Sequence, residues 1–216
     1  GEVAYDTTAT RWNSDIEAYR MEAGVYGTVH NGYWQAKLYY YNSDRGLPGA
    51  IVKNVWQNGE RQGDKNFFAQ ATFVKDITPG YKIQLNGKFA YDYTHYLSRD
   101  TVQFLQENVT KKMQFDNTYY QQDWYISMVN MYSILPVWDI SLSVDFQYNK
   151  LNAVMRGVGT PFTFPQRYTT WAAFATALNL GKWKLQADVL GTFVIEKVRN
   201  NVKAPDKSEF SPALII

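Results

Sequence analysis

Long runs of alternating apolar and polar residues constrain this chain more than any other feature. From Trp138 to Tyr148 every even position is apolar or aromatic, and the positions between are Asp, Ser or Gln. The same alternation runs through 19–30, 81–93 and 183–195. Side chains of a β-strand point alternately to opposite faces, whereas an amphipathic helix repeats its apolar residues every three or four positions. The pattern predicts an all-β chain with long amphipathic strands and no convincing helix.

The connections between these runs alternate between short and long. Turn residues such as Asn31-Gly32 and Pro79-Gly80 predict tight turns. Polar stretches predict long connections at 42–66, 98–117 and 151–167. Within the second of these connections, residues 101–107 could form a single helical turn. Short turns at one end and long loops at the other are typical of an outer-membrane β-barrel. We therefore expect a single domain over 1–216, an antiparallel up-and-down meander of about eight strands that is part of, or closes into, such a barrel. The strands are expected near 16–30, 33–42, 67–77, 81–97, 118–134, 138–150, 168–180 and 183–198.

Aromatic residues support the membrane interpretation. The chain has 17 Tyr, 12 Phe and 7 Trp, and a first group of rings directly follows each tight turn. A second group comes ten residues later, as in the steps from Tyr81 to Tyr91 and from Trp138 to Tyr148. A tilted strand crosses a bilayer in about 9–11 residues, with aromatic girdles at both edges. There is no run of 18 apolar residues, which argues against a transmembrane helix.

We expect the apolar positions of different strands to form one continuous face that meets lipid. Its predicted members are Ile83, Leu85, Ile140, Leu142, Val144, Val189 and Phe193. Periodicity alone does not distinguish this face from the inward face of a soluble barrel or sandwich. A soluble β-rich module with an internal ligand cavity is therefore the alternative, and a purely structural outer-membrane barrel is a third.

Composition argues against several function classes. The net charge is +2 without a run of Lys and Arg, so we expect no nucleic-acid partner. With no Cys and two His, a thiolate metal site and a cysteine nucleophile are excluded, and a histidine cluster is disfavoured. Carboxylates such as Asp64 and Glu60 lack the spacing of a calcium loop. We expect no catalytic site, no metal and no cofactor.

Two segments resemble a known family. Tyr39–Ala50, with the sequence YYYNSDRGLPGA, and Lys207–Leu214, with the sequence KSEFSPAL, are similar to stretches of TonB-dependent outer-membrane receptors, especially those of Bacteroides-like bacteria. The resemblance implies a location in the bacterial outer membrane and uptake of an iron–siderophore complex, cobalamin or a similar scarce nutrient. It also implies contact with outer-membrane lipid and with TonB.

The chain also departs from that family. Such receptors have about 22 strands and an N-terminal plug that engages TonB. Neither the plug nor a signal peptide is recognisable here, and the last residues, 211–216, read as the beginning of a further strand. We therefore expect a barrel fragment that lacks the plug.

Ligand contacts are expected in the long connections, because loops on a rigid scaffold carry recognition. The candidate ligand-binding residues are Arg45, Trp56, Phe104 and Arg156, since Trp and Arg are enriched at binding hot spots and Phe adds apolar surface. For Arg45 and its neighbours Asp44 and Gly46, a role in holding the loop is the competing hypothesis.

Overall fold

The computed structural model describes residues 10–48, 59–106, 109–156, 162–199 and 207–215. They form nine strands in one sheet, and no helix occurs among them. Within this part of the chain there is accordingly no helix long and apolar enough to cross a membrane. The strands are β1 (Ile16–Val29), β2 (Gly32–Leu47), β3 (Glu60–Thr78), β4 (Tyr81–Gln106), β5 (Val109–Leu135), β6 (Trp138–Arg156), β7 (Gln166–Leu180), β8 (Trp183–Lys197) and β9 (Lys207–Ile215).

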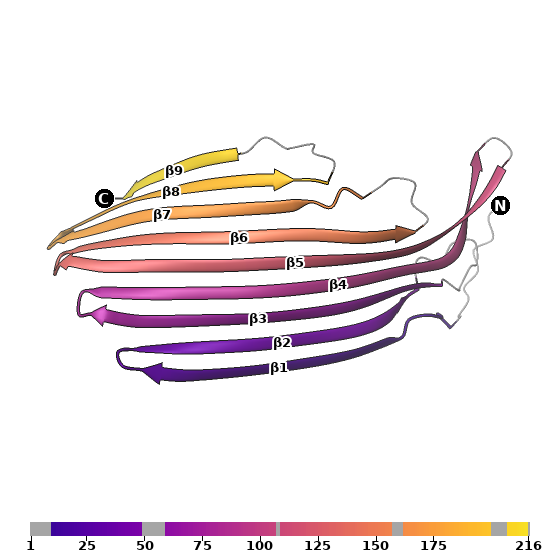
Figure 1. Ribbon diagram of the computed structural model, residues 1–216, viewed down its shortest axis with the longest axis horizontal. Helices are drawn as coiled ribbons and strands as arrows, with labels where there is room; N and C mark the ends of the chain where they lie inside the picture. The colour runs from indigo at the N-terminus through magenta and orange to yellow at the C-terminus, as the bar shows by residue number, and fades with distance from the viewer. Residues whose placement is uncertain (1–9, 49–58, 107–108, 157–161, 200–206, 216) are drawn as a thin grey trace, which may run out of the picture.

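The sheet is a meander in which every strand pairs antiparallel with the next one along the chain (Figure 1). Within the described residues, β1 pairs with β2 alone and β9 with β8 alone, so the sheet is not closed. The tight turns lie together at one end of the strands and the longer connections at the other. Asn31 and Gly181 have φ values of 55° and 65°, the left-handed conformation that two-residue hairpin turns require.

The predicted fold class is confirmed, but several strands, above all β2 to β6, are longer than predicted. A ninth strand, β9, follows the eight that were expected; it includes 211–215, where the sequence indicated the beginning of a further strand. The predicted connections 42–66 and 151–167 are too long, because β2 runs to Leu47, β3 begins at Glu60, and β6 runs to Arg156. Backbone pairing continues in these segments although apolar and polar residues no longer alternate: 42–46 and 60–66 are polar on both faces, and 151–156 has apolar residues on both.

The predicted connection 98–117 is wrong for the same reason, as is its helical turn at 101–107. β4 and β5 remain paired out to the partners Gln106 and Val109. The register shifts between Ser98 and Val102, and such irregularities bend a sheet locally. Figure 1 shows this hairpin projecting beyond its neighbours and bending away from the sheet.

Pairing places the predicted apolar positions on one side of the sheet, which we call the apolar face. Leu85 pairs with Met128, Met128 with Val144, Val144 with Ala172, and Ala172 with Gly191. Partners in an antiparallel pair point to the same side, so each such chain of partners is a row across that face. Ile83, Leu85, Ile140, Leu142, Val144, Val189 and Phe193 all lie on it, as predicted.

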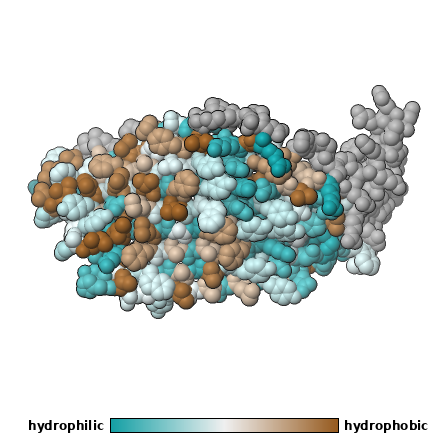
Figure 2. All heavy atoms as spheres, viewed as in Figure 1, coloured by the Kyte–Doolittle hydropathy of each residue, from teal (hydrophilic) through white to brown (hydrophobic). Residues whose placement is uncertain are grey.

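Aromatic residues lie along both ends of the apolar face. At the end near the tight turns they include Trp34, Tyr81, Tyr132, Trp138 and Trp183. At the other end neighbouring rings contact one another, with centroid distances of 4.4 Å for Phe89–Trp124, 5.3 Å for Tyr93–Tyr120 and 4.9 Å for Tyr148–Tyr168. In Figure 2 the hydrophobic side chains of the visible face gather toward the tight turns, and hydrophilic ones predominate toward the long connections.

The turn-end rings shift progressively from strand to strand. Trp34 of β2 lies in the same row as Val144 of β6 and Gly191 of β8. Trp138 lies six residues nearer the turns than Val144, and Trp183 lies eight nearer than Gly191. With a rise of about 3.3 Å per residue and about 4.8 Å between strands, eight residues over six strand steps correspond to a strand tilt of about 40°.

No second layer of protein covers the apolar face within the part of the chain that the structure describes. The buried apolar residues of the described chain are Val74 and Ala153, both on the opposite side of the sheet. Leu142, Phe146 and Phe193 expose 47%, 39% and 42% of their surface. The accessible surface of 15746 Å² exceeds the roughly 10000 Å² of a compact monomer of this mass. The sheet therefore presents a large apolar surface to its surroundings.

Candidate ligand-facing surface

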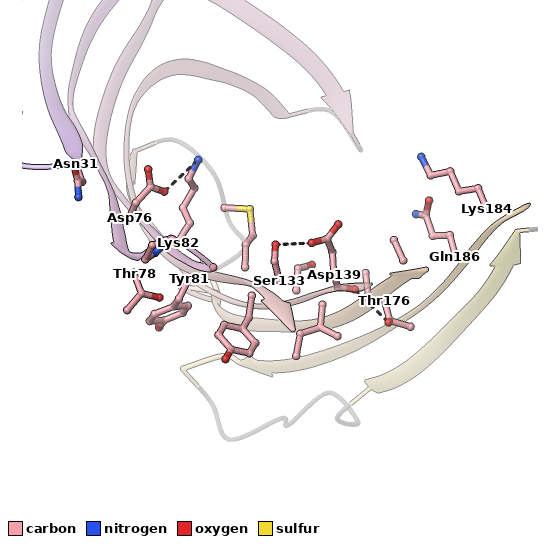
Figure 3. A pocket seen from close by; sticks show the side chains of 18 residues that line it. Asn31, Asp76, Thr78, Tyr81, Lys82, Ser133, Asp139, Thr176, Lys184 and Gln186 are labelled. Atoms are coloured by element: carbon pink, nitrogen blue, oxygen red, sulfur yellow. Dashed lines mark hydrogen bonds and ion pairs between the residues drawn. The ribbon is translucent and has the colours of Figure 1, made fainter. Parts of the chain in front are cut away.

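The side of the sheet opposite the apolar face carries most of the charged residues, and we call it the polar face. It follows from the same alternation, because the Asp, Lys, Gln and Ser residues between the apolar positions all point there. Figure 3 shows Asp76, Lys82, Asp139 and Lys184 pointing from this face into the hollow of the curved sheet, whereas Tyr81 points away from it. The polar face is therefore the side on which the sheet could surround a ligand.

One hollow lies on the polar face near the tight turns and has a volume of about 750 Å³. On one side the Lys82 ammonium lies 3.4 Å from a carboxylate oxygen of Asp76. Near the middle the Ser133 hydroxyl donates to Asp139 over 2.6 Å, and Lys184 lines the opposite side (Figure 3). Both carboxylates are thus held by donors, an arrangement that suits binding of polar groups better than proton transfer.

A second hollow of about 880 Å³ lies at the other end of β5–β8. Its lining combines the ring of Trp171 with side-chain amides and one ion pair, in which Arg167 Nε donates to Glu196 over 2.7 Å. Asn149, also in the lining, donates to Asp123. An aromatic ring among fixed hydrogen-bonding groups is the usual chemistry of a small-molecule site.

Arg45 lies on the polar face near the end of β2 that leads to the long connection. Its Nη2 atom is 3.3 Å from an Asp64 carboxylate oxygen. The same carboxylate accepts hydrogen bonds from the Gln62 amide and the Thr94 hydroxyl, each at 3.0 Å. Asp64 exposes 15% of its side chain and Arg45 exposes 40%. Arg45 is therefore held by the wall through a largely buried carboxylate while part of its guanidinium stays accessible.

The neighbouring residues of the same motif tie down the segment before β1. Asp44 forms an ion pair with Arg61, and Arg61 Nη2 also donates to Asp15 over 2.9 Å. The hydrogen bond from Arg61 lowers the pKa of the Asp15 carboxyl below its usual value. The Gly46 amide donates to the Asp15 carbonyl over 2.9 Å, and a Cβ at Gly46 would lie 2.2 Å from the Asn13 carbonyl oxygen. Asp44 and Gly46 therefore have clear structural roles.

A ring cluster lies midway along β1–β4 on the polar face. Tyr39 and Phe68 stack with centroids 4.8 Å apart. Lys88 Nζ lies 5.2 Å from the Phe68 centroid, and Arg20 lies 5.4 Å from the Tyr39 centroid. Lys37 lies 2.6 Å from Glu22, which leaves the cluster with excess positive charge.

The structure does not bring the four predicted ligand-binding residues together. Trp56 lies outside the described residues, and Phe104 lies in β4 where its side chain is not described. Arg45 and Arg156 are separated by four strand steps and point to opposite faces. Arg156 Nη1 lies 3.7 Å from Asp116, whose other carboxylate oxygen is 2.7 Å from His95 Nε2.

Sequence reasoning missed the hollow formed by Trp171, Arg167, Glu196 and Asn149. Each of these residues occupies a polar-face position of its strand, so the alternation contained a usable signal. Their assembly across three strands depends on how the strands are aligned with one another, and the spacing of residues within one strand does not determine that alignment. Among the described residues we find no group of three His, Asp or Glu that could hold a metal ion.

Comparison with known proteins gives a structural match alone. No protein-family profile and no curated protein sequence matches the chain. The fold is similar to that in the crystal structure of the ferric citrate transporter FecA in the unliganded form, with a TM-score of 0.59 and 10% sequence identity. The match covers 94% of this chain and 33% of FecA, so the chain spans about a third of the length of that transporter. At this identity the similarity concerns the fold.

Proposed function

We propose that this chain forms part of the wall of an outer-membrane receptor that takes up a scarce nutrient with energy supplied through TonB. The observation that carries the proposal is the apolar face, a continuous exposed surface bounded by aromatic residues at both ends. The likeness of the fold to the FecA barrel supports the same assignment.

The dimensions of the apolar face match those of a membrane-spanning barrel. Tyr81 and Tyr91, at its two ends on β4, are ten residues apart, or about 33 Å along the strand. A tilt of about 40° reduces this to about 25 Å, the height of the apolar band of outer-membrane barrels. A soluble barrel would turn this face inward and bury it, whereas here it is exposed.

The polar face then lines the interior of the barrel, and the long connections face the cell exterior. We propose an iron–siderophore complex, cobalamin or a similar nutrient as the ligand. Contacts are assigned to the connections 48–59 and 157–165 and to the projecting β4–β5 hairpin, with Arg45, Trp56 and Phe104 as candidates; Arg156, the fourth residue predicted from the sequence, lies on the outer face of the wall. Coupling to TonB is assigned to a plug domain outside these 216 residues.

The test uses the full-length receptor in detergent micelles, with binding of ferric siderophores and cobalamin measured by calorimetry. These 216 residues alone should fail the same assay, because they lack the plug and most of the wall that would enclose a ligand. Shortening the connection 48–59, the β4–β5 hairpin or the connection 157–165, one at a time, should weaken binding of the true ligand at least ten-fold for one of them. Matched substitutions in the tight turn 78–80 are the control and should leave affinity unchanged. Unchanged affinity for all three variants, with the barrel still folded, would place the site elsewhere.

Detergent dependence tests the membrane assignment separately. The protein should aggregate without detergent or lipid, because its apolar face needs a non-aqueous neighbour. A monodisperse, ligand-binding protein in plain buffer would instead support the soluble binding module.

A further inference from the structure

Two lysines lie on the apolar face of β6 and β8, where its aromatic border meets the long connections. Lys150 pairs with Gln166 of β7, and Gln166 pairs with Lys197 of β8, so both lysines belong to one row. Two strand spacings separate their backbones by about 10 Å. Each side chain is long and flexible, so both ammonium groups can reach one anionic group between them.

The positive charge of this pair is uncompensated on its own side of the sheet. Neither lysine forms an ion pair with a described residue. The nearest carboxylates along the chain and across the strands, Glu196 and Asp123, point to the polar face, where Arg167 and Asn149 hold them. The described neighbours of the two lysines on the apolar face are uncharged, namely Gln122, Trp124, Tyr148, Asn152, Gln166, Tyr168 and Ile195.

Aromatic rings fix the position of the pair at the edge of the apolar band. Lys197 Nζ lies 5.2 Å from the centroid of Tyr168, a cation–π contact. Tyr168 in turn lies 4.9 Å from Tyr148. Tyr at a membrane surface lies at the level of the lipid headgroups, and Lys near it extends its ammonium toward them.

Below the lysines the surface is apolar and exposed. The next rows toward the turns contain Phe146 and Phe193, which expose 39% and 42% of their surface, on either side of the smaller Thr170. This stretch offers contact to hydrocarbon chains directly beneath two positive charges. A ligand with an anionic head and acyl tails matches both parts.

We propose that Lys150 and Lys197 bind the phosphate of a phosphorylated lipid in the outer leaflet, whose acyl chains lie against Phe146 and Phe193. The inference rests on the proposed function, because it requires the apolar face to meet lipid. It adds a lipid site on the outside of the wall, on the face opposite to the nutrient.

The test measures binding of phosphorylated lipid A to the protein in detergent micelles, beside dephosphorylated lipid A and inorganic phosphate. Removing the phosphate should weaken lipid binding about thirty-fold. This factor is the product of two contributions of about five-fold, one from the attraction of each lysine to the phosphate. The double variant K150Q/K197Q should lose as much, and K150R/K197R should retain binding. The control K88Q/K184Q removes two charges from the polar face and should leave lipid affinity unchanged.

Three results would overturn the lipid site. They are equal affinity for both lipids, unchanged affinity in K150Q/K197Q, and full competition by equimolar inorganic phosphate. Quenching of tryptophan fluorescence by brominated lipids tests the premise independently. Strong quenching with unchanged affinity in the double variant would overturn the lipid site alone, whereas absence of quenching would overturn the membrane assignment as well.

Discussion

A charge placed in the middle of the apolar face tests whether that face meets lipid. Leu142 lies four residues from Trp138 and six from Tyr148 on β6, and 47% of its surface is exposed. Four residues span about 13 Å along the strand, which a tilt of about 40° converts to a depth of about 10 Å. Arg near the midplane of a barrel destabilises it by about 2–4 kcal/mol. Leu142→Arg should therefore lower the folding equilibrium constant roughly 30-fold to 900-fold.

Ser141 provides the matched control, because it precedes Leu142 and points to the opposite face. It lines the hollow of about 750 Å³, which also contains Asp139 and Asp76. An Arg side chain introduced there enters a roomy polar space near two carboxylates, so Ser141→Arg should change stability by less than about 1 kcal/mol. The measurement is reversible urea unfolding in phospholipid vesicles, followed by tryptophan fluorescence.

The comparison of the two variants decides between the two orientations of the sheet. If Ser141→Arg is as destabilising as Leu142→Arg, the faces are not distinguished by lipid and the reasoning fails. If Ser141→Arg is the more destabilising variant, the polar face is packed against protein. Equal tolerance of both variants would show that neither face meets a low-dielectric medium.

Two further variants test contacts at the end of the sheet near the long connections. Gly46→Ala should displace the segment before β1, because the new Cβ would lie 2.2 Å from the Asn13 carbonyl oxygen. Hydrogen exchange at the amide of residue 46 should then rise at least ten-fold. The control Gly87→Ala, where no atom lies within 4 Å of the new Cβ, should leave this exchange unchanged. Asp64→Ala should lower the free energy of unfolding by about 1–3 kcal/mol, because it removes a carboxylate that accepts hydrogen bonds from three donors, among them Arg45. A loss below about 0.5 kcal/mol would show that water replaces the carboxylate.

Much of the candidate site was beyond prediction from sequence. Arg45 was a reasonable candidate, since it ends a strand beside a long connection, but its fixed partner Asp64 comes from the next strand. Arg156 was predicted from its place in a connection, yet β6 extends through it and places it on the apolar face. Where apolar and polar residues do not alternate regularly, the sequence does not distinguish a strand from a loop, and only the pairing of the backbones shows which it is.

The amino-acid sequence by itself determined the class of the fold and the composition of each face. Alternation between 138 and 148 sorts side chains within one strand, because the period of a β-strand is two whatever its neighbours are. The tertiary structure decided the register, the full extent of the strands and the tilt. Register depends on contacts between residues far apart in sequence, and it alone brings Trp171, Arg167 and Glu196 to one hollow and sets Lys150 and Lys197 in one row.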